Sequence, residues 1–491
     1  MFILSYCHLK RMNHRPVLYV IGLFLTAMAK FMLIPVIYDL LTGDSDIWEF
    51  VAAAAITLIT GGALTINFKP EHFNMKPRQV FVLTTLCWLA VCTFAALPFW
   101  FKLPISYTDA FFETMSGITT TGSTILTGLD HMDPSILIWR SLLQWFGGIG
   151  FIVMAVAVLP FLKVGGMRLF QSESSDWSEK AMPRSGSIAK RIVTVYLIMT
   201  AICAYLYFLG GMTGFEAINH SMTTVSTGGY STSDASMGLF KNPFIIWTST
   251  IFMILASLPF VLFVRCMRGE VNCFYEDTQV QAFIGFLLVV WLVLSIWLCF
   301  NSDYTFLQSL TLVSFNTTST VTTTGFAYGD YTLWGGFSNL MFFFLLFVGG
   351  CSGSTAGGIK IFRFQIGGKL LNIQLKQLVH PRACFVQTYN GQQISSEILR
   401  SLIGFSFFFI LLIALMSLLL SLYDLDPITS ITGATTAVAN VGPGLGTIIG
   451  PAGNFSSLPD AAKWILSVGM LLGRLEVITV LVLFTPAFWK G

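Results

Sequence analysis

The sequence is poor in charge. Only 10% of its 491 residues are Asp, Glu, Lys or Arg, against 55% hydrophobic residues. A soluble globular protein carries about a quarter charged residues, so a chain of this composition cannot cover its surface for water. The nine cysteines include no Cys-x-x-Cys pair and no metal-ligand spacing, which favours reduced core residues over a disulfide framework or a metal site.

Motifs of catalytic and nucleotide chemistry are also missing. The chain has no HExxH, no GxSxG with partner residues, no Walker sequence and no dinucleotide fingerprint. These absences argue against a membrane-embedded enzyme and against a tightly bound cofactor, and no nucleic-acid partner is expected. Control by a nucleotide would have to come from a partner protein.

Long apolar runs are what the sequence has instead. Each is close to the roughly 20 residues that cross a bilayer as a helix. The early ones are Val17–Leu41, Ile47–Ile66, Val80–Phe101, Ile136–Leu162, Ile192–Leu209, Phe244–Val264 and Val280–Phe300. The first run is too long for a signal peptide and lacks a small-residue cleavage site. The sequence therefore predicts an all-α polytopic membrane protein.

The basic residues predict its orientation. All but six of the 27 fall on one side if the N-terminus is cytoplasmic, as the positive-inside rule requires. The exceptions are Lys102, Lys241 and Lys463 in the opposite loops and Lys30, Arg140 and Arg474 within apolar segments. We therefore expect a multi-pass protein of a bacterial inner (plasma) membrane, in contact with lipid, with its N-terminus in the cytoplasm.

A pattern of an apolar span, a short segment, a turn and a second span occurs four times. The short segments are Tyr107–Ile118, Gly214–Thr224, Thr305–Thr320 and Pro427–Val438. They are too short to cross, so each must enter and leave the membrane on the same side. Non-helical backbone at membrane depth is tolerated where it lines a water-filled cavity or is buried in protein. The pattern predicts four quarters of one pore.

The turns that follow the short segments are rich in small and hydroxylated residues. They are Thr119, Thr120, Thr121 and Gly122; Val225, Ser226, Thr227 and Gly228; Thr322, Thr323, Thr324 and Gly325; and Ala439, Asn440, Val441 and Gly442. Rings of backbone carbonyls can replace the water of a potassium ion, and glycine supplies the positive φ that aims them. A T-x-G turn can also simply end a helix, but four copies in register favour a selectivity filter.

These repeats predict the domain organisation. All four have the same orientation, as in parallel repeats around an axis along the membrane normal. We expect an N-terminal helical hairpin over residues 1–68, then pore repeats over 69–186, 187–277, 278–394 and 395–491. The fold would contain ten crossing helices and four half-helices.

A glycine-rich segment interrupts the third repeat. Residues 349–358 include Gly349, Gly350, Gly353, Gly357 and Gly358, and Ser352 lies among them. Glycines each cost up to about 1 kcal/mol in a helix, and the apolar stretch before them is too short to cross. One possibility is that the span ends here and a cytoplasmic linker follows. The short upstream stretch favours a broken helix whose loop lies across the pore and gates it.

Arg474 lies inside the last expected span, Ala461–Leu483, where a cation is costly and usually functional. Glu476 is two residues away and faces another side of a helix. Arg474 either pairs with another helix or lies beneath the filter, where its charge opposes cations and it contacts the gating loop. Glu113 and Arg140 in repeat one look like a structural pair, and Glu216 and His220 in repeat two are expected to be structural as well.

These motifs resemble the Trk/Ktr/HKT superfamily of potassium transporters, and within it the TrkH/TrkG-type membrane subunit. The pieces that carry the resemblance are Thr119–Ser123, Ser226–Gly229, Thr322–Phe326, Asn440–Gly444 and Gly349–Lys360. The resemblance implies one filter glycine per repeat, an intramembrane gating loop and an arginine at position 474. Glycine at position 122, where some plant members have serine, implies potassium as the ion.

The resemblance also implies partners. It implies a homodimer that works with a TrkA-type cytosolic ring, which binds nucleotides. The basic stretches Lys163–Arg191 and Lys360–Arg382 could dock this ring, although basic loops beside a bilayer are ordinarily topology signals. The alternative function is a symporter that couples potassium to sodium or protons. Parallel repeats favour a channel-like pore, and the scarcity of paired carboxylates in the spans argues against proton coupling.

Overall fold

The computed structural model describes residues 13–43, 46–72, 75–157, 181–383, 385, 388–389, 392–394 and 396–490. Within these residues the strands are β1 (Thr388–Tyr389) and β2 (Gln392–Gln393), which pair antiparallel. Seven helices are long and apolar enough to cross a membrane, or up to nine if two bent pairs count as one span each. The prediction of an all-α polytopic membrane protein is confirmed.

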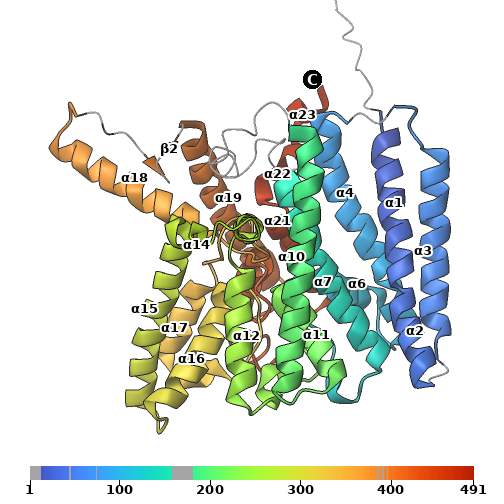
Figure 1. Cartoon of the computed structure of the whole chain (residues 1–491), viewed down its shortest axis with the longest axis horizontal. Coiled ribbons are helices and arrows are strands. Elements are labelled where there is room, and N and C mark those ends of the chain that lie inside the picture. Colours follow the sequence, from blue (N-terminus) through green and yellow to red (C-terminus); the bar gives the residue numbers. More distant parts are fainter. Residues whose placement is uncertain are drawn as a thin grey trace, which may run out of the picture. The chain divides into compact units, whose positions relative to one another are not determined.

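The chain divides into two compact units, Met1–Pro104 with Leu475–Gly491, and Ile105–Arg474. The helices of the first unit are α1 (Arg15–Phe31), α2 (Leu33–Thr42), α3 (Trp48–Asn67), α4 (Pro77–Ala95), α5 (Leu97–Lys102), α22 (Val477–Leu481) and α23 (Pro486–Lys490), with a 3-10 turn, η4, over Val482–Phe484. α1 packs against α3 and α4 (Figure 1). Gly22 and Gly61 let α1 and α3 approach closely, because a Cβ on either would collide with the other's carbonyl oxygen.

The second unit contains the four expected short helices and the spans around them. Its helices are α6 (Tyr107–Ile118), α7 (Pro134–Ala157), α10 (Ala181–Leu209), α11 (Gly214–Val225), α12 (Pro243–Ala256), α13 (Phe260–Cys266), α14 (Cys273–Glu276), α15 (Thr278–Asn301), α16 (Phe306–Val321), α17 (Gly336–Leu345), α18 (Ile361–Val379), α19 (Ser396–Ser421), α20 (Pro427–Ala439) and α21 (Asp460–Arg474). Short 3-10 turns lie at Leu129–His131, Ser236–Leu239 and Tyr331–Trp334.

The half-helices α6, α11, α16 and α20 begin in the same way. They have 12, 12, 16 and 13 residues, and in each the side chain before the first residue accepts a hydrogen bond from the N–H three positions on. The pairs are Ser106 with Asp109, Thr213 with Glu216, Thr305 with Gln308, and Asp426 with Thr429. Such a cap satisfies a donor that a helix otherwise leaves unpaired.

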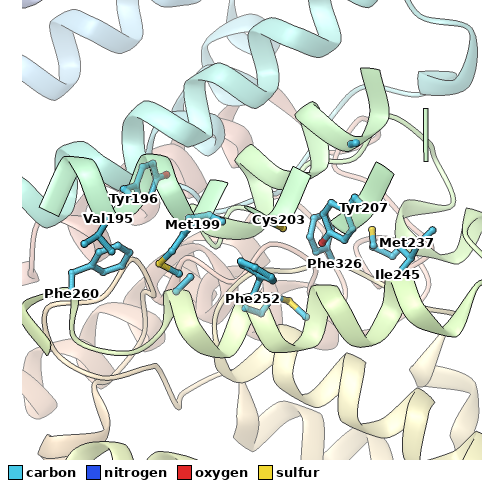
Figure 2. Close-up of a cluster of buried hydrophobic side chains, with 14 of the residues drawn as sticks. Val195, Tyr196, Met199, Cys203, Tyr207, Met237, Ile245, Phe252, Phe260 and Phe326 are labelled. Carbon is cyan, nitrogen blue, oxygen red and sulfur yellow. The ribbon is translucent and has the colours of Figure 1, made fainter. Parts of the chain in front are cut away.

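The half-helices pack against spans of neighbouring repeats. α7 contacts α11, α12 contacts α16, and α21 contacts α6. Figure 1 shows α10, α11 and α12 beside one another. An apolar core lies between α10 and α12, and it includes Tyr196, Met199 and Tyr207 of α10 and Phe252 of α12 (Figure 2). Contacts between helices therefore join each repeat to its neighbour.

Two expected spans are not continuous helices. The helix expected over Phe244–Val264 is broken between α12 and α13, with a bend of 93°, because Pro259 has no N–H to continue the ladder. The helix expected over Ala461–Leu483 ends at Arg474, and Glu476 has a positive φ of 56°. Both predictions of an unbroken span are wrong. Residues 158–162 of the expected span Ile136–Leu162 lie outside the described residues.

The outward faces of the spans are apolar. On α15, Phe283, Leu287 and Val290 are buried, whereas Val289 and Leu292 are more than half exposed. An exposed apolar stripe along a helix of 24 residues is unfavourable in water and suits a lipid environment. The chain is accordingly a multi-pass membrane protein.

Candidate functional site

One or two positions after the end of each half-helix lies a residue with left-handed backbone. These residues are Thr120, Thr227, Thr323 and Asn440, with φ of 53°, 51°, 56° and 56°. Two positions later comes a glycine with positive φ: Gly122, Gly229, Gly325 and Gly442, with φ of 88°, 79°, 82° and 112°. In between, an N–H returns to the carbonyl five residues back: Thr121 to Ser116, Gly228 to Thr223, Thr324 to Ser319 and Val441 to Thr436, at 2.8, 2.8, 2.8 and 3.0 Å. All four turns therefore have the same backbone.

This shared backbone corrects the expected register of repeat two. Gly228 was expected to match Gly122, but the N–H of Gly228 makes the same return bond as that of Thr121. Gly229 has the positive φ of the other glycines. The four segments are thus Thr119–Gly122, 226–229, Thr322–Gly325 and 439–442, and Val225 belongs to α11. We call these the filter segments, after the function that the sequence predicts for them.

The glycines of the filter segments each face the carbonyl oxygen of another repeat. A Cβ on any of the four would come within 3.0 Å of that oxygen, closer than real Cβ atoms approach. The contacts run from repeat to repeat and close on themselves: Gly122 with Gly228, Gly229 with Thr324, Gly325 with Val441, and Gly442 with Thr121. The four filter segments form a ring, and glycine is required at these places both for φ and for space.

The ring contains buried carbonyl groups that accept no hydrogen bond. Within the described residues no donor reaches the carbonyl oxygens of Thr120, Thr121, Thr227, Thr323, Thr324, Asn440 or Val441, and all seven residues are at most 1% exposed. Buried backbone carbonyls are nearly always paired. Seven unpaired carbonyl oxygens are therefore gathered in one ring of the described residues.

A polar side chain in each half-helix holds the chain that leaves its filter segment. Thr124 and the N–H of Ile125 donate to the Glu113 carboxylate, and Tyr328 exchanges two bonds with the Asn316 amide at 2.9 and 3.0 Å. His220 contacts Ser231 at 3.0 Å, and Thr432 accepts from the N–H of Leu445 at 3.1 Å. These bonds tie each half-helix to its own return strand.

The two pairs that were expected to be structural are so. Arg140 Nε lies 2.9 Å from Glu113 Oε1, and both side chains are at most 1% exposed. Arg140 also donates to the carbonyl of Ser231 and lies over the ring of Tyr230. Glu216 caps α11 through Thr213, and the other ring nitrogen of His220 contacts the carbonyl of Glu216.

The glycine-rich segment forms a loop closed at its base. Val348 and Ile359 form a parallel β-bridge, and the N–H of Gly349 donates to Ile359 at 2.9 Å. A Cβ on Gly349 would collide with the carbonyl oxygen of Gly357, so the two arms of the loop touch. Positive φ at Gly353 and Gly358 turns the chain. We call residues 349–358 the glycine loop.

The glycine loop is anchored to the break between α12 and α13. The N–H of Cys351 donates to Ser257 O at 2.9 Å, and Thr355 donates to Ala256 O through both its N–H and its hydroxyl. Phe260 donates to Gly353 O at 3.0 Å. The broken span thus supplies carbonyls that an unbroken helix would use internally. On α15, Gln279 Oε1 accepts from the N–H of Ser352.

The other end of the glycine loop contacts the ring. The N–H of Gly357 donates to Thr323 Oγ1 at 2.6 Å, and that of Gly358 donates to Ala439 O at 2.8 Å. Gly350 packs against Ser257 and Ala356, where a Cβ would collide. The structure therefore brings the expected gating residues Gly349, Gly350, Ser352, Gly353, Gly357 and Gly358 together, directly against two filter segments.

Arg474 joins this cluster at the end of α21. Its Nη1 donates to Thr355 O at 2.9 Å, and the guanidinium lies 4.2 Å from the centre of the Phe151 ring. The residue is 2% exposed, and its Nε and Nη2 atoms have no hydrogen-bond partner in the part of the chain that the structure describes. Among the described residues no carboxylate lies within 4.0 Å of it. Lys360 also lies over Phe151 and donates to Ala356 O.

Two supporting residues were not found from the sequence. Gln144 of α7 binds Gly228 and Tyr230, and Gln279 binds the glycine loop. Both are fully buried. A glutamine within an apolar span is costly unless its amide is paired, so its presence in Ile136–Leu162 was a usable signal. Its partners lie more than 80 residues away in the chain and could not be read from spacing.

Known proteins with this architecture are transporters. The family model of the TrkH cation transport proteins matches residues 47–490. The Trk system potassium uptake protein TrkI of Halomonas elongata is 49% identical over 97% of both chains. TrkH of Escherichia coli strain K12 is 36% identical over 98% of this chain and 100% of its own.

A solved structure agrees with these sequence comparisons. The crystal structure of the potassium transporter TrkH from Vibrio parahaemolyticus covers 98% of this chain with a TM-score of 0.90, at 34% identity and over the whole of that chain. The chain belongs to the TrkH family of cation transport proteins, which are transporters and not enzymes.

Proposed function

We propose that this chain is the membrane subunit of a Trk-type potassium uptake system and that potassium ions pass through the ring of filter segments. The relatives named above are potassium uptake proteins. The observation that carries the proposal is the closed series of glycine-to-carbonyl contacts, with seven buried carbonyls that receive no donor from the described residues. We retain residues 69–186, 187–277, 278–394 and 395–491 as the four pore repeats, after a hairpin over 1–68.

The chemistry of the ring suits potassium. A potassium ion that sheds water needs several oxygens at once, and carbonyl dipoles supply them without holding the ion too tightly to leave. The C-terminal ends of α6, α11, α16 and α20 lie directly before the filter segments. Each end carries about half a negative charge, so four of them favour a cation at the ring. Position 122 is glycine, where some plant members of the superfamily have serine, and this glycine supports potassium over sodium.

The glycine loop and Arg474 form the gate in this proposal. The loop is hydrogen bonded to two filter segments, and Arg474 holds Thr355 of the loop. Permeation then requires the loop to leave the ring and the contacts with Ala256, Ser257 and Gln279 to break. Several modest hydrogen bonds hold it, so a regulatory partner can shift the balance.

A TrkA-type nucleotide-binding ring on the cytoplasmic side is the proposed partner, with the subunit working as a homodimer in the inner membrane and its N-terminus in the cytoplasm. α18 belongs to the basic stretch Lys360–Arg382 and directly follows the glycine loop, so a partner bound there could move the loop. Residues 163–180 of the other basic stretch lie outside the described residues. Coupled symport with sodium or protons remains the alternative.

Ion flux in liposomes tests this function. The purified protein should carry potassium faster than sodium, and the cytosolic partner with its nucleotide should change the rate. Reversal potentials in opposed ion gradients separate the two mechanisms, because a channel follows the potassium gradient alone and a symporter shifts with sodium or pH. Protein that is folded and carries no potassium under any of these conditions would refute the proposal.

A further inference from the structure

Repeat two lacks a side chain at the position before its filter glycine. Repeats one, three and four have Thr121, Thr324 and Val441 there, and repeat two has Gly228. Thr121 contacts the hydroxyl of Thr119 and Thr324 that of Thr322, both at 2.8 Å, and Thr121 also accepts a hydrogen bond from the Asn440 amide of repeat four at 2.9 Å. Repeat two has no equivalent bond of its own, because glycine cannot form one.

Gln144 occupies the space that Gly228 leaves. A Cβ on Gly228 would collide with the amide carbon of Gln144. The Gln144 amide donates through Nε2 to Gly228 O at 2.6 Å and accepts through Oε1 from the N–H of Tyr230 at 2.9 Å. A side chain from α7 thus replaces the missing side chain and grips the filter segment on both sides of Gly229.

The ring is therefore not fourfold symmetric in its chemistry. The carbonyl of Gly228 has a donor, while the equivalent carbonyls of Thr121, Thr324 and Val441 have none among the described residues. Gly228 O is also the atom that Gly122 faces in the ring. The hydrogen bond from Gln144 consequently fixes the position of the Gly228 carbonyl oxygen and, with it, the contact of this oxygen with Gly122 of repeat one.

Because position 144 is buried, the side chain there must have both its donor and its acceptor paired. Gln144 is 0% exposed, and an unpaired amide in such a place costs about 1–3 kcal/mol. The carbonyl and the N–H that it pairs with lie two residues apart on one strand. A side chain that offers both a donor and an acceptor at that spacing is needed, which glutamine provides and an apolar or acidic residue does not.

We propose that Gln144 is a positioning residue of the filter that determines ion selectivity by holding the carbonyl of Gly228 in the ring. This inference rests on the proposed function, because it assigns a role to Gln144 in that same ring. It deepens the proposal by making repeat two depend on α7 at this position, where repeats one and three have hydroxyl groups that bond within and between the filter segments and repeat four has Val441.

The test compares variants at position 144 by potassium and sodium flux in liposomes, per folded molecule. Gln144→Met keeps the volume and removes both bonds, and Gln144→Glu keeps an acceptor for Tyr230 and loses the donor to Gly228. Each should lower the potassium-to-sodium flux ratio by about fivefold or more, as expected for the loss of an interaction worth one net hydrogen bond. Ser141→Ala, whose hydroxyl bonds to Leu137 within α7, should leave the ratio unchanged.

A double variant guards against misfolding of the single ones. Gly228→Ala should reduce folded protein because its Cβ would collide with the amide carbon and the amide oxygen of Gln144. Adding Gln144→Ala removes these two atoms and leaves a contact of 2.9 Å with the Cβ of residue 144, so it should raise the yield above that of Gly228→Ala but should not restore the selectivity. Wild-type selectivity in Gln144→Met, or equal yields of Gly228→Ala with and without Gln144, would overturn the inference. Wild-type protein that carries no potassium would instead refute the proposed function.

Discussion

Arg474 carries a buried positive charge that the described carboxylates do not neutralise. It contacts a carbonyl oxygen and an aromatic face, and two of its nitrogens have no hydrogen-bond partner among the described residues. A buried charge in a region that screens poorly acts over several ångströms. Such a residue is unfavourable for stability, so a role in opposing cations explains its presence better than a role as a scaffold.

Replacing Arg474 separates these roles. Arg474→Ala should raise potassium flux per folded molecule by about tenfold, which corresponds to about 1.4 kcal/mol of barrier, and should weaken the dependence on the cytosolic partner. Arg474→Lys keeps the charge and should keep the flux low. Flux assays with quantified folded protein give the answer. A lower yield of Arg474→Ala with unchanged flux would leave Arg474 as a scaffold.

Asn316 shows how one side chain fixes a filter segment. It exchanges two hydrogen bonds with Tyr328 across the turn that contains Thr323 and Gly325. Asn316→Leu removes both bonds to the part-buried backbone N–H and carbonyl of Tyr328 and should lower the free energy of unfolding by about 2 kcal/mol.

Thermal unfolding in detergent measures this effect. Asn301→Ala is the matched control, because the Asn301 amide makes an exposed bond within α15 and its loss should change little. An Asn316→Leu protein that unfolds at the wild-type temperature would contradict the assigned role.

Individual filter residues were predictable only in part from the sequence. Gly122, Gly325 and Gly442 follow from a pattern in which one glycine closes each turn. Repeat two has two adjacent glycines. Which of them corresponds to Gly122 depends on the hydrogen bond from the N–H of Gly228 to the carbonyl of Thr223, which cannot be seen in the sequence, and this bond identifies Gly229. Gln144 was missed for a related reason, since it acts on a strand far along the chain.

At the scale of elements, the glycine loop is held by three others. The α12–α13 break, α15 and the filter segments each bind it. Each hydrogen bond has a net contribution of about 1 kcal/mol, so under the proposed function the loop is closed by default and a partner can open it.

Weakening this attachment should open the pore. Deleting Gly350–Ala356 should raise potassium flux strongly if the protein folds. Thr355→Val is the milder change, because it removes one bond to Ala256 O at nearly constant volume and should raise basal flux by about fivefold. Thr311→Val on α16, whose hydroxyl bonds to Leu307 in the same helix, is the control. Folded variants with normal or lower flux would refute the gating role of the loop.

Segment length and capping residues predicted where the helices lie, but they did not predict where two of the long helices break. The four half-helices were expected within a residue or two of where they lie, since short apolar segments preceded by Ser, Thr or Asp have clear starts. The break of Phe244–Val264 was missed although Pro259 marks it. The break is explained by the glycine loop, whose N–H groups bind the backbone carbonyls that the break leaves without helical partners.

At the scale of the molecule, the second unit is organised around one ring. Each filter glycine touches a different repeat, so an error in one segment affects its neighbour. The contact of α21 with α6 and that of Gly442 with Thr121 both join the fourth repeat to the first. The sequence indicated four similar quarters, but their closure depends on contacts between residues about 320 positions apart.

The most direct test of this account is the reversal potential with potassium on one side of a bilayer and sodium on the other. It should be measured for the wild type and for Gly122→Ser, Gly229→Ser, Gly325→Ser and Gly442→Ser. The control is Gly150→Ser, where an added Cβ meets nothing within 4 Å. The account expects a potassium-selective wild type and control, and a lower potassium preference in each of the other four. A folded variant of any of these four with the wild-type reversal potential would contradict a ring to which all four repeats contribute.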